Sequence, residues 1–295
     1  MIRFFVFSDL HYDHVFDADE RVENLISKIN DSQLEFVISL GDLCYPINKN
    51  KQVISRFQNL KIPFYYCVGN HDCENYNLHN IERFFGLGNL FYSFVIEDIK
   101  FIVLNSCFME HGHEVILYQK EKYEKNTDIY PIIPEFEMEW LKQEMLRDDM
   151  KYVILSHHSL ANDFGNRGVA NRKIVRGLLE KKQTILAMNG HDHGDDLRIL
   201  NQIPYFTVNS ASYMWHGKAK YTYAKELHNK YPYLKDIILY KDPLCCIVEI
   251  EDRNVKIYGM KSDYQTIVPE DVGVTNRQWN GISIEPRISD WKRMK

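Results

Sequence analysis

Residues 64–72 read FYYCVGNHD, in which a short apolar run passes directly into Gly69, Asn70, His71 and Asp72. A short apolar run closed by glycine and polar residues is typical of a buried β-strand that ends at a loop. Sites in open α/β sheets form just outside the carboxyl ends of such strands. This stretch therefore predicts a strand that ends in side chains able to bind a metal ion or a substrate.

Four more apolar runs end in the same way. They are FFVF into Ser8-Asp9-Leu10-His11, FVISL into Gly41-Asp42, YVIL into Ser156-His157-His158, and TILAM into Asn189-Gly190-His191-Asp192-His193. Because the carboxyl ends of parallel strands meet at one edge of a sheet, we expect all five clusters to meet there. Asp, Asn and His donors without a thiolate suit Mn²⁺, Fe or Zn²⁺ better than an all-oxygen Mg²⁺ or Ca²⁺ cage. The five runs therefore predict a metal site at this edge.

The residues between the first three runs predict helices. Apolar residues recur there at helical spacing, as Val22, Leu25, Ile26 and Ile29 and again as Val53, Ile54, Phe57 and Leu60. Residues 1–70 are therefore expected to form strand-helix-strand-helix-strand, a parallel sheet with right-handed crossovers. Further helices are expected at Asn77–Phe85, from Pro134 onward and at Asn171–Lys182, and further strands at Leu90–Ile96, Lys100–Leu104, Tyr205–Val208, Cys245–Ile250 and Val255–Met260.

Two segments show neither the apolar spacing of a helix nor the apolar run of a buried strand. Residues 106–133 are expected to be irregular, and residues 213–240 form an aromatic, Lys-rich insertion. A loop longer than packing needs is often functional, so substrate specificity is expected to lie in these two segments and in residues 160–170.

We expect one domain over residues 1–260, with residues 261–295 as a C-terminal tail packed on it.

The composition is that of an ordinary globular protein. The 295 residues are 45% hydrophobic and 26% charged, with a formal net charge of −5. This length supports a substantial core, and the negative charge argues against broad binding to nucleic acids or anionic membranes. We expect no leader segment before the first run; no apolar stretch of the sequence approaches a membrane span, and the six cysteines show no repeated spacing. We therefore expect a cytoplasmic protein with reduced thiols.

The order of the five clusters carries a specific resemblance. The series Asp9-x-His11, Gly41-Asp42, Gly69-Asn70-His71-Asp72, His157-His158 and Gly190-His191-x-His193 resembles the calcineurin-like metallophosphoesterase family. All five blocks occur in the order of that family, each after an apolar strand. The resemblance implies an α/β fold: a four-layer αββα sandwich of two mixed β-sheets flanked by helices, with two metal ions at the strand ends.

The resemblance also implies a role for each clustered residue. The first metal ion would be held by Asp9, His11 and His193, and the second by Asn70, His157 and His191, with Asp42 bridging the two. His71 would bind no metal; it would lie beside the substrate phosphate and protonate the leaving oxygen or stabilise the developing charge. Asp72 would orient either His71 or a loop.

Several assignments keep an alternative. His157 is taken as the ligand because it is nearer the strand, which leaves His158 as a substrate or supporting contact, although the reverse assignment stays open. Tyr45 matches a position that binds iron in the purple acid phosphatase branch, but His11 would compete for the same coordination site. We interpret Tyr45 as a pocket or packing residue, or as a weak contact near the first metal. His111, His113 and Arg167 are candidate substrate contacts, each weighed against an ordinary surface position.

The resemblance implies a binuclear metal-dependent hydrolase of phosphate esters. A phosphodiesterase that uses metal-activated water on a small phosphodiester or nucleotide is expected first, in the style of the cyclic-nucleotide and glycerophosphodiester branch. A nucleotide pyrophosphatase or a phosphomonoesterase is the second expectation, and a non-enzymatic scaffold that keeps the metal site is the third. The expected cofactors are two ions of Mn, Fe or Zn. The expected partner is a small phosphate ester, not a nucleic-acid polymer or a membrane.

Overall fold

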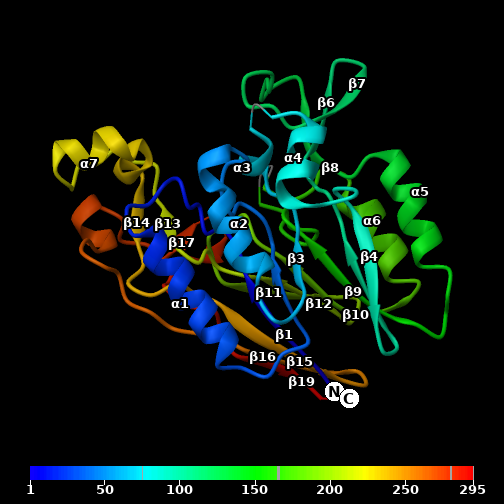
Figure 1. Cartoon of the computed structure of the whole chain (residues 1–295). Coiled ribbons are helices and arrows are strands. Elements are labelled where there is room, and N and C mark those ends of the chain that lie inside the picture. Colours follow the sequence, from blue (N-terminus) through cyan, green and yellow to red (C-terminus); the bar gives the residue numbers. More distant parts are fainter. Residues whose placement is uncertain (75, 165–166, 280, 295) are drawn as a thin grey trace.

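The computed structural model describes residues 1–295 except 75, 165–166, 280 and 295. Two six-stranded sheets within this part of the chain pack face to face, and helices cover the outer face of each sheet (Figure 1). This arrangement confirms the expected α/β sandwich of four layers.

The first sheet contains the first three apolar runs. Its strand order is β19-β16-β15-β1-β2-β3, in which β1, β2 and β3 are parallel and the rest are antiparallel. The bounds are β1 (Ile2–Phe7), β2 (Phe36–Ser39), β3 (Phe64–Tyr66), β15 (Cys246–Glu251), β16 (Asn254–Tyr258) and β19 (Trp291–Arg293), with the crossover helices α1 (Ala18–Asn30) and α2 (Lys51–Gln58). The predicted strand-helix-strand-helix-strand unit is therefore confirmed.

The second sheet carries the last two runs. Its order is β11-β12-β10-β9-β5-β4, with parallel pairing from β12 to β5 and antiparallel strands at both edges. The bounds are β4 (Tyr92–Ile96), β5 (Ile99–Val103), β9 (Lys151–Ser156), β10 (Gln183–Asn189), β11 (Asp196–Leu200) and β12 (Ile203–Thr207), covered by α5 (Glu135–Glu144) and α6 (Arg172–Leu179). Strand β11 had no counterpart in the sequence-based prediction, because its residues are only half-buried and carry charge.

Alternation along β1 shows how the layers are held together. Phe4 and Val6 lie in the core between the sheets, whereas Phe5 and Phe7 pack beneath the helices of the first sheet. A strand that is buried on both faces needs apolar residues at successive positions. This is why the runs in the sequence are continuous instead of alternating.

The two segments that fitted neither pattern contain regular structure. Residues 106–133 form a small sheet of β6 (Phe108–His111), β7 (Glu114–Leu117) and β8 (Ile129–Ile132), so the expectation of an irregular loop was wrong. These strands have four residues each and are largely half-buried or exposed, and their short apolar stretches, such as residues 115–118, are separated by the polar residues 110–114 and 119–128. Residues 213–240 contain β13 (Tyr213–Trp215), α7 (Lys225–Lys230), the 3₁₀-helix η2 (Pro232–Lys235) and β14 (Ile237–Leu239). Both segments lie at the end of the molecule opposite the two termini (Figure 1).

The remaining elements complete the chain. They are η1 (Asn48–Asn50), α3 (Asn70–Cys73), α4 (Leu78–Phe85), η3 (Pro269–Val272), β17 (Gln278–Trp279) and β18 (Ile282–Ser283). Within residues 261–295, β19 pairs with β16, and Ile284 and Ile288 are buried in the core between the sheets. No helix in the described part of the chain is both long enough and apolar enough to span a membrane.

Candidate metal centre

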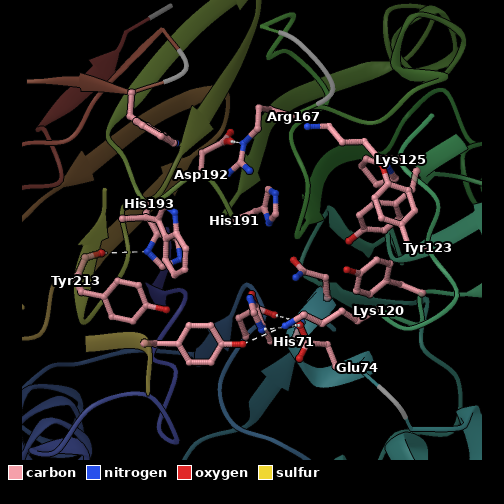
Figure 2. Close-up of a pocket in the computed structure, with 18 residues that line it drawn as sticks. His71, Glu74, Lys120, Tyr123, Lys125, Arg167, His191, Asp192, His193 and Tyr213 are labelled. Carbon is pink, nitrogen blue, oxygen red and sulfur yellow. Dashed lines mark hydrogen bonds and ion pairs between the residues drawn. The ribbon is translucent and has the colours of Figure 1, made fainter. Parts of the chain in front are cut away.

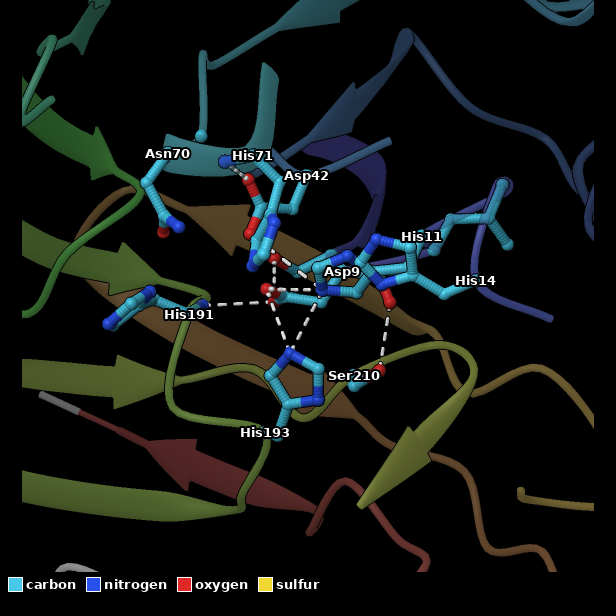
Figure 3. A network of polar contacts seen from close by, with 12 residues as sticks. Asp9, His11, His14, Asp42, Asn70, His71, His191, His193 and Ser210 are labelled. Atoms are coloured by element: carbon cyan, nitrogen blue, oxygen red, sulfur yellow. Dashed lines mark hydrogen bonds and ion pairs between the residues drawn. The ribbon is translucent and has the colours of Figure 1, made fainter. Parts of the chain in front are cut away.

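The loops that follow the apolar strands are joined to one another by backbone hydrogen bonds. The amide of Asp9 donates to the carbonyl of Gly41 (3.0 Å), and the amide of His11 donates to the carbonyl of Asp42 (2.9 Å). Within the second sheet, the amide of Gly190 donates to the carbonyl of His157 (3.1 Å), and between the two sheets the amide of His191 donates to Asp9 Oδ2 (2.9 Å). These bonds bring the expected clusters together at one edge of the sandwich (Figure 3).

The backbone at this edge is unusual. Among the described non-glycine residues with positive φ are Asp9 (53°), His11 (47°), Asp42 (52°), His191 (67°) and His193 (47°). The left-handed conformation is unfavourable for residues with a Cβ and persists where the surrounding structure imposes it. Five of the seven predicted ligands are thus held in a strained backbone conformation, which aims their side chains inward.

Gly190 shows how tightly the loops approach each other. A Cβ at this position would collide with Ser8 Oγ and Asp9 Oδ2. The glycine in this cluster is therefore required by a close approach between the loop after β1 and the loop after β10.

In each of the carboxylates of Asp9 and Asp42, one oxygen is held by hydrogen bonds and the other faces the imidazoles of the cluster. Asp9 Oδ2 accepts from Ser8 Oγ (2.5 Å) and from the amide of His191 (2.9 Å), whereas Oδ1 is buried without a hydrogen-bond partner. Asp42 Oδ1 accepts from the amide of His71 (2.8 Å), and Oδ2 lies 3.3 Å from His157 Nε2. A buried carboxylate oxygen that faces only imidazoles costs free energy unless a proton or a cation meets it.

Backbone carbonyls fix the orientation of two imidazoles. His157 Nδ1 donates to the carbonyl of Leu40 (2.7 Å), and His193 Nδ1 donates to the carbonyl of Tyr213 (3.0 Å). Because a carbonyl can only accept, each Nδ1 carries the proton and each Nε2 is left facing the carboxylates. His193 Nε2 lies 3.4 Å from Asp9 Oδ1 and 3.0 Å from His11 Nε2. Histidine ligands of metal ions are usually held in this way.

Ionisation in the cluster matches the needs of a cation site. Burial raises the pKa of Asp9 and of Asp42, but the surrounding histidines outweigh burial and hold both pKa values well below the ordinary range. Burial lowers the pKa of His11 to about 4, so this ring is neutral. Burial also lowers the pKa of His157, but Asp42 outweighs it and brings the value to about 9. Ionised carboxylates and displaceable imidazole protons are what metal binding requires.

The donor atoms form overlapping groups. Within the described residues, donors lie within 4.8 Å of one another in the groups Asp9–His11–His193, Asp9–Asp42–His157 and His157–His158–His191. Asn70 Oδ1 lies 3.2 Å from His157 Nε2. Asp42 Oδ2 also lies 3.7 Å from His11 Nε2, so this carboxylate is within reach of both ends of the cluster. The residues therefore fit a centre for two metal ions with mixed oxygen and nitrogen donors.

Comparison with known proteins agrees with this geometry. The sequence of residues 2–195 matches the family model described as calcineurin-like phosphoesterase. The chain belongs to the calcineurin-like phosphoesterase family. It is accordingly a hydrolase of phosphate esters. No curated protein sequence matches the chain significantly.

Solved structures show the same fold at low identity. A dimetal phosphatase from Danio rerio has a TM-score of 0.62 at 12% identity, over 88% of this chain and 95% of that one. GAP50, the anchor in the inner membrane complex of Plasmodium, has a TM-score of 0.56 at 16% identity, over 96% of each chain. PhoD has a TM-score of 0.53 at 13% identity, over 87% of this chain and 65% of that one. At these identities the likeness shows the fold alone.

The structure separates the neighbouring His157 and His158 of this phosphoesterase. His157 Nε2 faces Asp42, whereas both nitrogens of His158 have partners elsewhere: Ser106 Oγ (3.0 Å) and Tyr130 OH (3.0 Å). His158 still lies next to the cluster, because its ring centroid is 4.1 Å from that of His191. The geometry favours His157 as the donor and His158 as a buried support.

His71 and Asp72 lie at the start of α3 with different surroundings. His71 Nδ1 lies 3.1 Å from Glu74 Oε1, and its side chain is 25% exposed. Asp72 is fully buried, and its Oδ2 accepts from the amides of Asp42 (2.9 Å) and Gly69 (2.7 Å). Burial and the charge of Asp42 raise the pKa of Asp72 to about 7. Of the two roles considered for Asp72, its contacts correspond to holding the loops together.

Tyr45 does not point at the donor atoms. Its hydroxyl contacts His14 Nε2 (3.0 Å), and His14 Nδ1 contacts the hydroxyl of Tyr213 (3.1 Å). Donors of His11, His14 and His71 also lie within 4.8 Å of one another. Because both ring nitrogens of His14 already have tyrosine partners, we interpret His14 as a buried packing residue.

The other candidate contacts divide into two kinds. Arg167 Nε lies 3.3 Å from Asp192 Oδ1, and both residues line the cavity beside the cluster; residues 165–166 lie outside the described part of the chain. His111 pairs with Asp128 (3.1 Å), and His113 is exposed at the turn after β6. Neither histidine is among the residues that line this cavity. The residues of segment 106–133 that do line the cavity come later in the chain, from Tyr118 onward.

A cavity of about 720 Å³ opens beside the cluster (Figure 2). One group of lining residues belongs to the predicted clusters: Asp42, Asn70, His71, His191, Asp192 and His193. A second group comes from residues 106–133: Tyr118, Lys120, Tyr123, Lys125, Tyr130 and Pro131. A third comes from residues 213–240: Tyr213, Trp215 and Tyr233. Glu74, Arg167 and Trp279 complete the lining.

Glu74, Lys120 and Tyr233 were not singled out in the sequence. Glu74 Oε1 contacts both His71 Nδ1 (3.1 Å) and Lys120 Nζ (3.4 Å). Burial raises the pKa of Glu74, but the contacts with His71 and Lys120 outweigh burial and hold the pKa below its ordinary value. The spacing of Glu74, three residues after His71, was the available signal in the sequence. No pattern in the sequence indicates the positions of Lys120 and Tyr233, because their contacts depend on how the two insertions fold.

Proposed function

We propose that this phosphoesterase is a binuclear metal-dependent phosphodiesterase that acts on a small phosphodiester or nucleotide. The observation that supports it most is the position of the donor cluster. Buried carboxylate and imidazole donors lie at the floor of a cavity of about 720 Å³, in the size range of sites for small organic ligands.

The residues of the cluster divide into two sets around Asp42. Asp9, His11 and His193 would hold one ion, Asn70, His157 and His191 would hold the other, and Asp42 would contact both. Bound ions of this kind polarise a phosphoryl oxygen and lower the pKa of a water molecule. The unpartnered Asp9 Oδ1 and the inward-facing Nε2 atoms of His157 and His193 support this division.

His71 is the proposed proton donor to the leaving oxygen. It lines the cavity beside the donor cluster, and its ring lies 5.0 Å from that of His11, centroid to centroid. Its amide is held by Asp42 Oδ1, so the orientation of the loop is tied to the cluster. A positioned histidine that protonates a leaving group typically contributes about 10²–10⁴-fold to a rate.

The walls of the cavity favour a diester over a monoester. Tyr123 and Tyr213 lie on opposite sides of the cavity, with His191 between them (Figure 2). A phosphodiester carries two organic groups on the phosphorus and can place one against each wall, whereas a monoester carries one. Aromatic walls suit planar or apolar groups.

A nucleotide pyrophosphatase is the second candidate. Lys125 and Arg167 line the same cavity, and Figure 2 shows the side chain of Lys125 extending towards Arg167. Two cationic side chains on one wall suit a second phosphate group. Asp192 offsets part of this charge through its ion pair with Arg167, so we rank this activity below the diesterase.

A substrate screen tests the proposal. The chain is reconstituted separately with Mn²⁺, Fe and Zn²⁺, and its metal content is measured before turnover. Bis-p-nitrophenyl phosphate, p-nitrophenyl phosphate, cyclic nucleotides and dinucleoside diphosphates then serve as substrates. We expect bound metal and fastest turnover on diesters. Absence of both metal and turnover under all three conditions would contradict the proposal, and preference for the diphosphates would favour the second candidate.

A further inference from the structure

Glu74 lies where it can control the orientation of His71. It follows α3 directly, and its amide donates to the carbonyl of Asn70 (3.1 Å), which brings its side chain alongside that of His71. The Glu74 side chain is only 9% exposed. Its Oε1 lies 3.1 Å from His71 Nδ1, although the ring N–H is not aligned as a full hydrogen bond. Catalytic hydrogen bonds are often poorly aligned in ligand-free enzymes and tighten with substrate.

A carboxylate at Nδ1 decides which ring nitrogen faces the substrate. Because an ionised carboxylate can only accept, it keeps a proton on Nδ1 and restricts rotation of the ring, so that in the protonated ring the proton on Nε2 is the one passed to the leaving oxygen. The Nε2 atom is then directed away from Glu74. A histidine oriented by a third group in this way is a general arrangement for proton transfer.

Lys120 connects this pair to both insertions. Its Nζ lies 3.4 Å from Glu74 Oε1 and donates to the hydroxyl of Tyr233 (3.1 Å). The Tyr233 ring stacks on His14, with centroids 4.0 Å apart. Figure 2 shows His71, Glu74 and Lys120 side by side at one edge of the cavity. Residues 106–133 and 213–240 therefore meet beside the proposed proton donor.

We infer that Glu74 is a positioning residue for His71, and that Lys120 of the insertion keeps the Glu74 carboxylate in place. The inference rests on the proposed function, because it concerns the delivery of a proton to a leaving oxygen. It assigns the insertion a part in the chemistry in addition to lining the cavity. The contribution of Lys120 is expected to be smaller, because its side chain is 51% exposed and exposed ion pairs are weak.

The test compares matched variants on two substrates. Glu74→Met and Lys120→Met remove the charged groups at similar chain length, and Glu74→Asp keeps a carboxylate. Glu121→Met and Lys122→Met make the same changes at neighbouring exposed residues that do not line the cavity. Each metal-loaded variant is assayed on two diesters. Phenyl ethyl phosphate releases phenolate, a poor leaving group, and p-nitrophenyl ethyl phosphate releases p-nitrophenolate, a good one. The bound metal is counted in every sample.

A proton donor matters most when the leaving oxygen is basic. Glu74→Met is expected to lower kcat/KM by about 10- to 100-fold on the phenyl ester and by less than about 3-fold on the nitrophenyl ester, with unchanged metal content. Lys120→Met should show the same selectivity with a smaller loss, and Glu74→Asp should recover part of it. The two control variants should match the wild type.

A second measurement does not depend on turnover. In the zinc-loaded protein at alkaline pH, where the His71 ring is neutral, ¹⁵N spectra of this ring, assigned by their absence in His71→Asn, should show the remaining proton on Nδ1. In Glu74→Met the preference of this proton for Nδ1 over Nε2 should weaken. Equal losses on both esters, or an unchanged tautomer, would overturn this inference while leaving the proposed function standing. An inactive metal-loaded wild type would overturn the proposed function, and this inference with it.

Discussion

The donor cluster and the wall of the cavity are built in different ways. The cluster lies at the ends of largely buried strands of the two six-stranded sheets, and five of its residues adopt left-handed backbone conformations that only tight packing maintains. The wall comes from short strands and turns in residues 106–133 and 213–240, where Lys120 and Lys125 are exposed. We therefore expect the sheets to determine the kind of reaction and the insertions to determine the substrate.

The largest effect is expected from the centre of the cluster. Asp42→Asn keeps an oxygen that can accept from the amide of His71 but removes the charge that both ends of the cluster share. We expect loss of bound metal and a fall in turnover of more than about 10⁴-fold, beyond the contribution of any single proton donor. Metal analysis and bis-p-nitrophenyl phosphate turnover measure both. Full metal content in this variant would show that Asp42 does not bridge.

His71→Ala distinguishes the chemistry from the metal site. The imidazole lines the cavity but is not assigned to either ion, so we expect turnover to fall by about 10²–10⁴-fold. The metal content should stay at the wild-type level. If this variant lost its metal and kept its activity per bound ion, the role assigned to His71 would be wrong.

Gly190→Ala tests whether the cluster depends on close packing of the loops. The added Cβ would meet Ser8 Oγ and Asp9 Oδ2, so we expect a loss of about 1–3 kcal/mol in the free energy of unfolding and weaker metal binding. Gly177→Ala is the matched control, because it lies in α6 with open space around its Cβ. It should stabilise the protein by about 0.5–1 kcal/mol. Equal behaviour of the two variants in urea unfolding would contradict the packing argument.

The smallest effect on the reaction is expected from the wall. Tyr123→Ala removes a half-buried ring that lines the cavity and contacts Tyr130. We expect KM to rise several-fold for diesters with aromatic groups, with little change for small alkyl diesters and none in metal content. Kinetics on paired aryl and alkyl diesters measure the difference. A large loss of kcat on every ester would show that the wall takes part in the reaction itself.

Much of the cluster was predictable from the sequence. The strands were visible because burial on both faces makes them continuous apolar runs, and each run ended at its donors. The convergence of Asp9 and Asp42 follows from the parallel strands β1 and β2, which end at one edge of the first sheet, whereas His157 reaches the cluster from the second sheet. The distinction between His157 and His158 needed the structure, since it depends on which ring turns towards Ser106 and Tyr130.

The rest depended on contacts between segments far apart in the chain. Lys120 and Tyr233 are 113 residues apart, and their hydrogen bond follows from the folding of two insertions with no strong local period. The strands of residues 106–133 were missed for the same reason. The strained conformations of His11 and His193 likewise leave no trace in the sequence, because residues with a Cβ rarely adopt them.

Metal stoichiometry tests the central claim most directly. Wild type and Asp42→Asn are stripped of metal, reconstituted with Mn²⁺, Fe or Zn²⁺, separated from excess ion and measured by mass spectrometry against protein concentration. The convergence of five strand ends predicts two ions for each wild-type chain and a clear loss in Asp42→Asn. A wild type that binds no metal, or a variant that binds as much as the wild type, would contradict it.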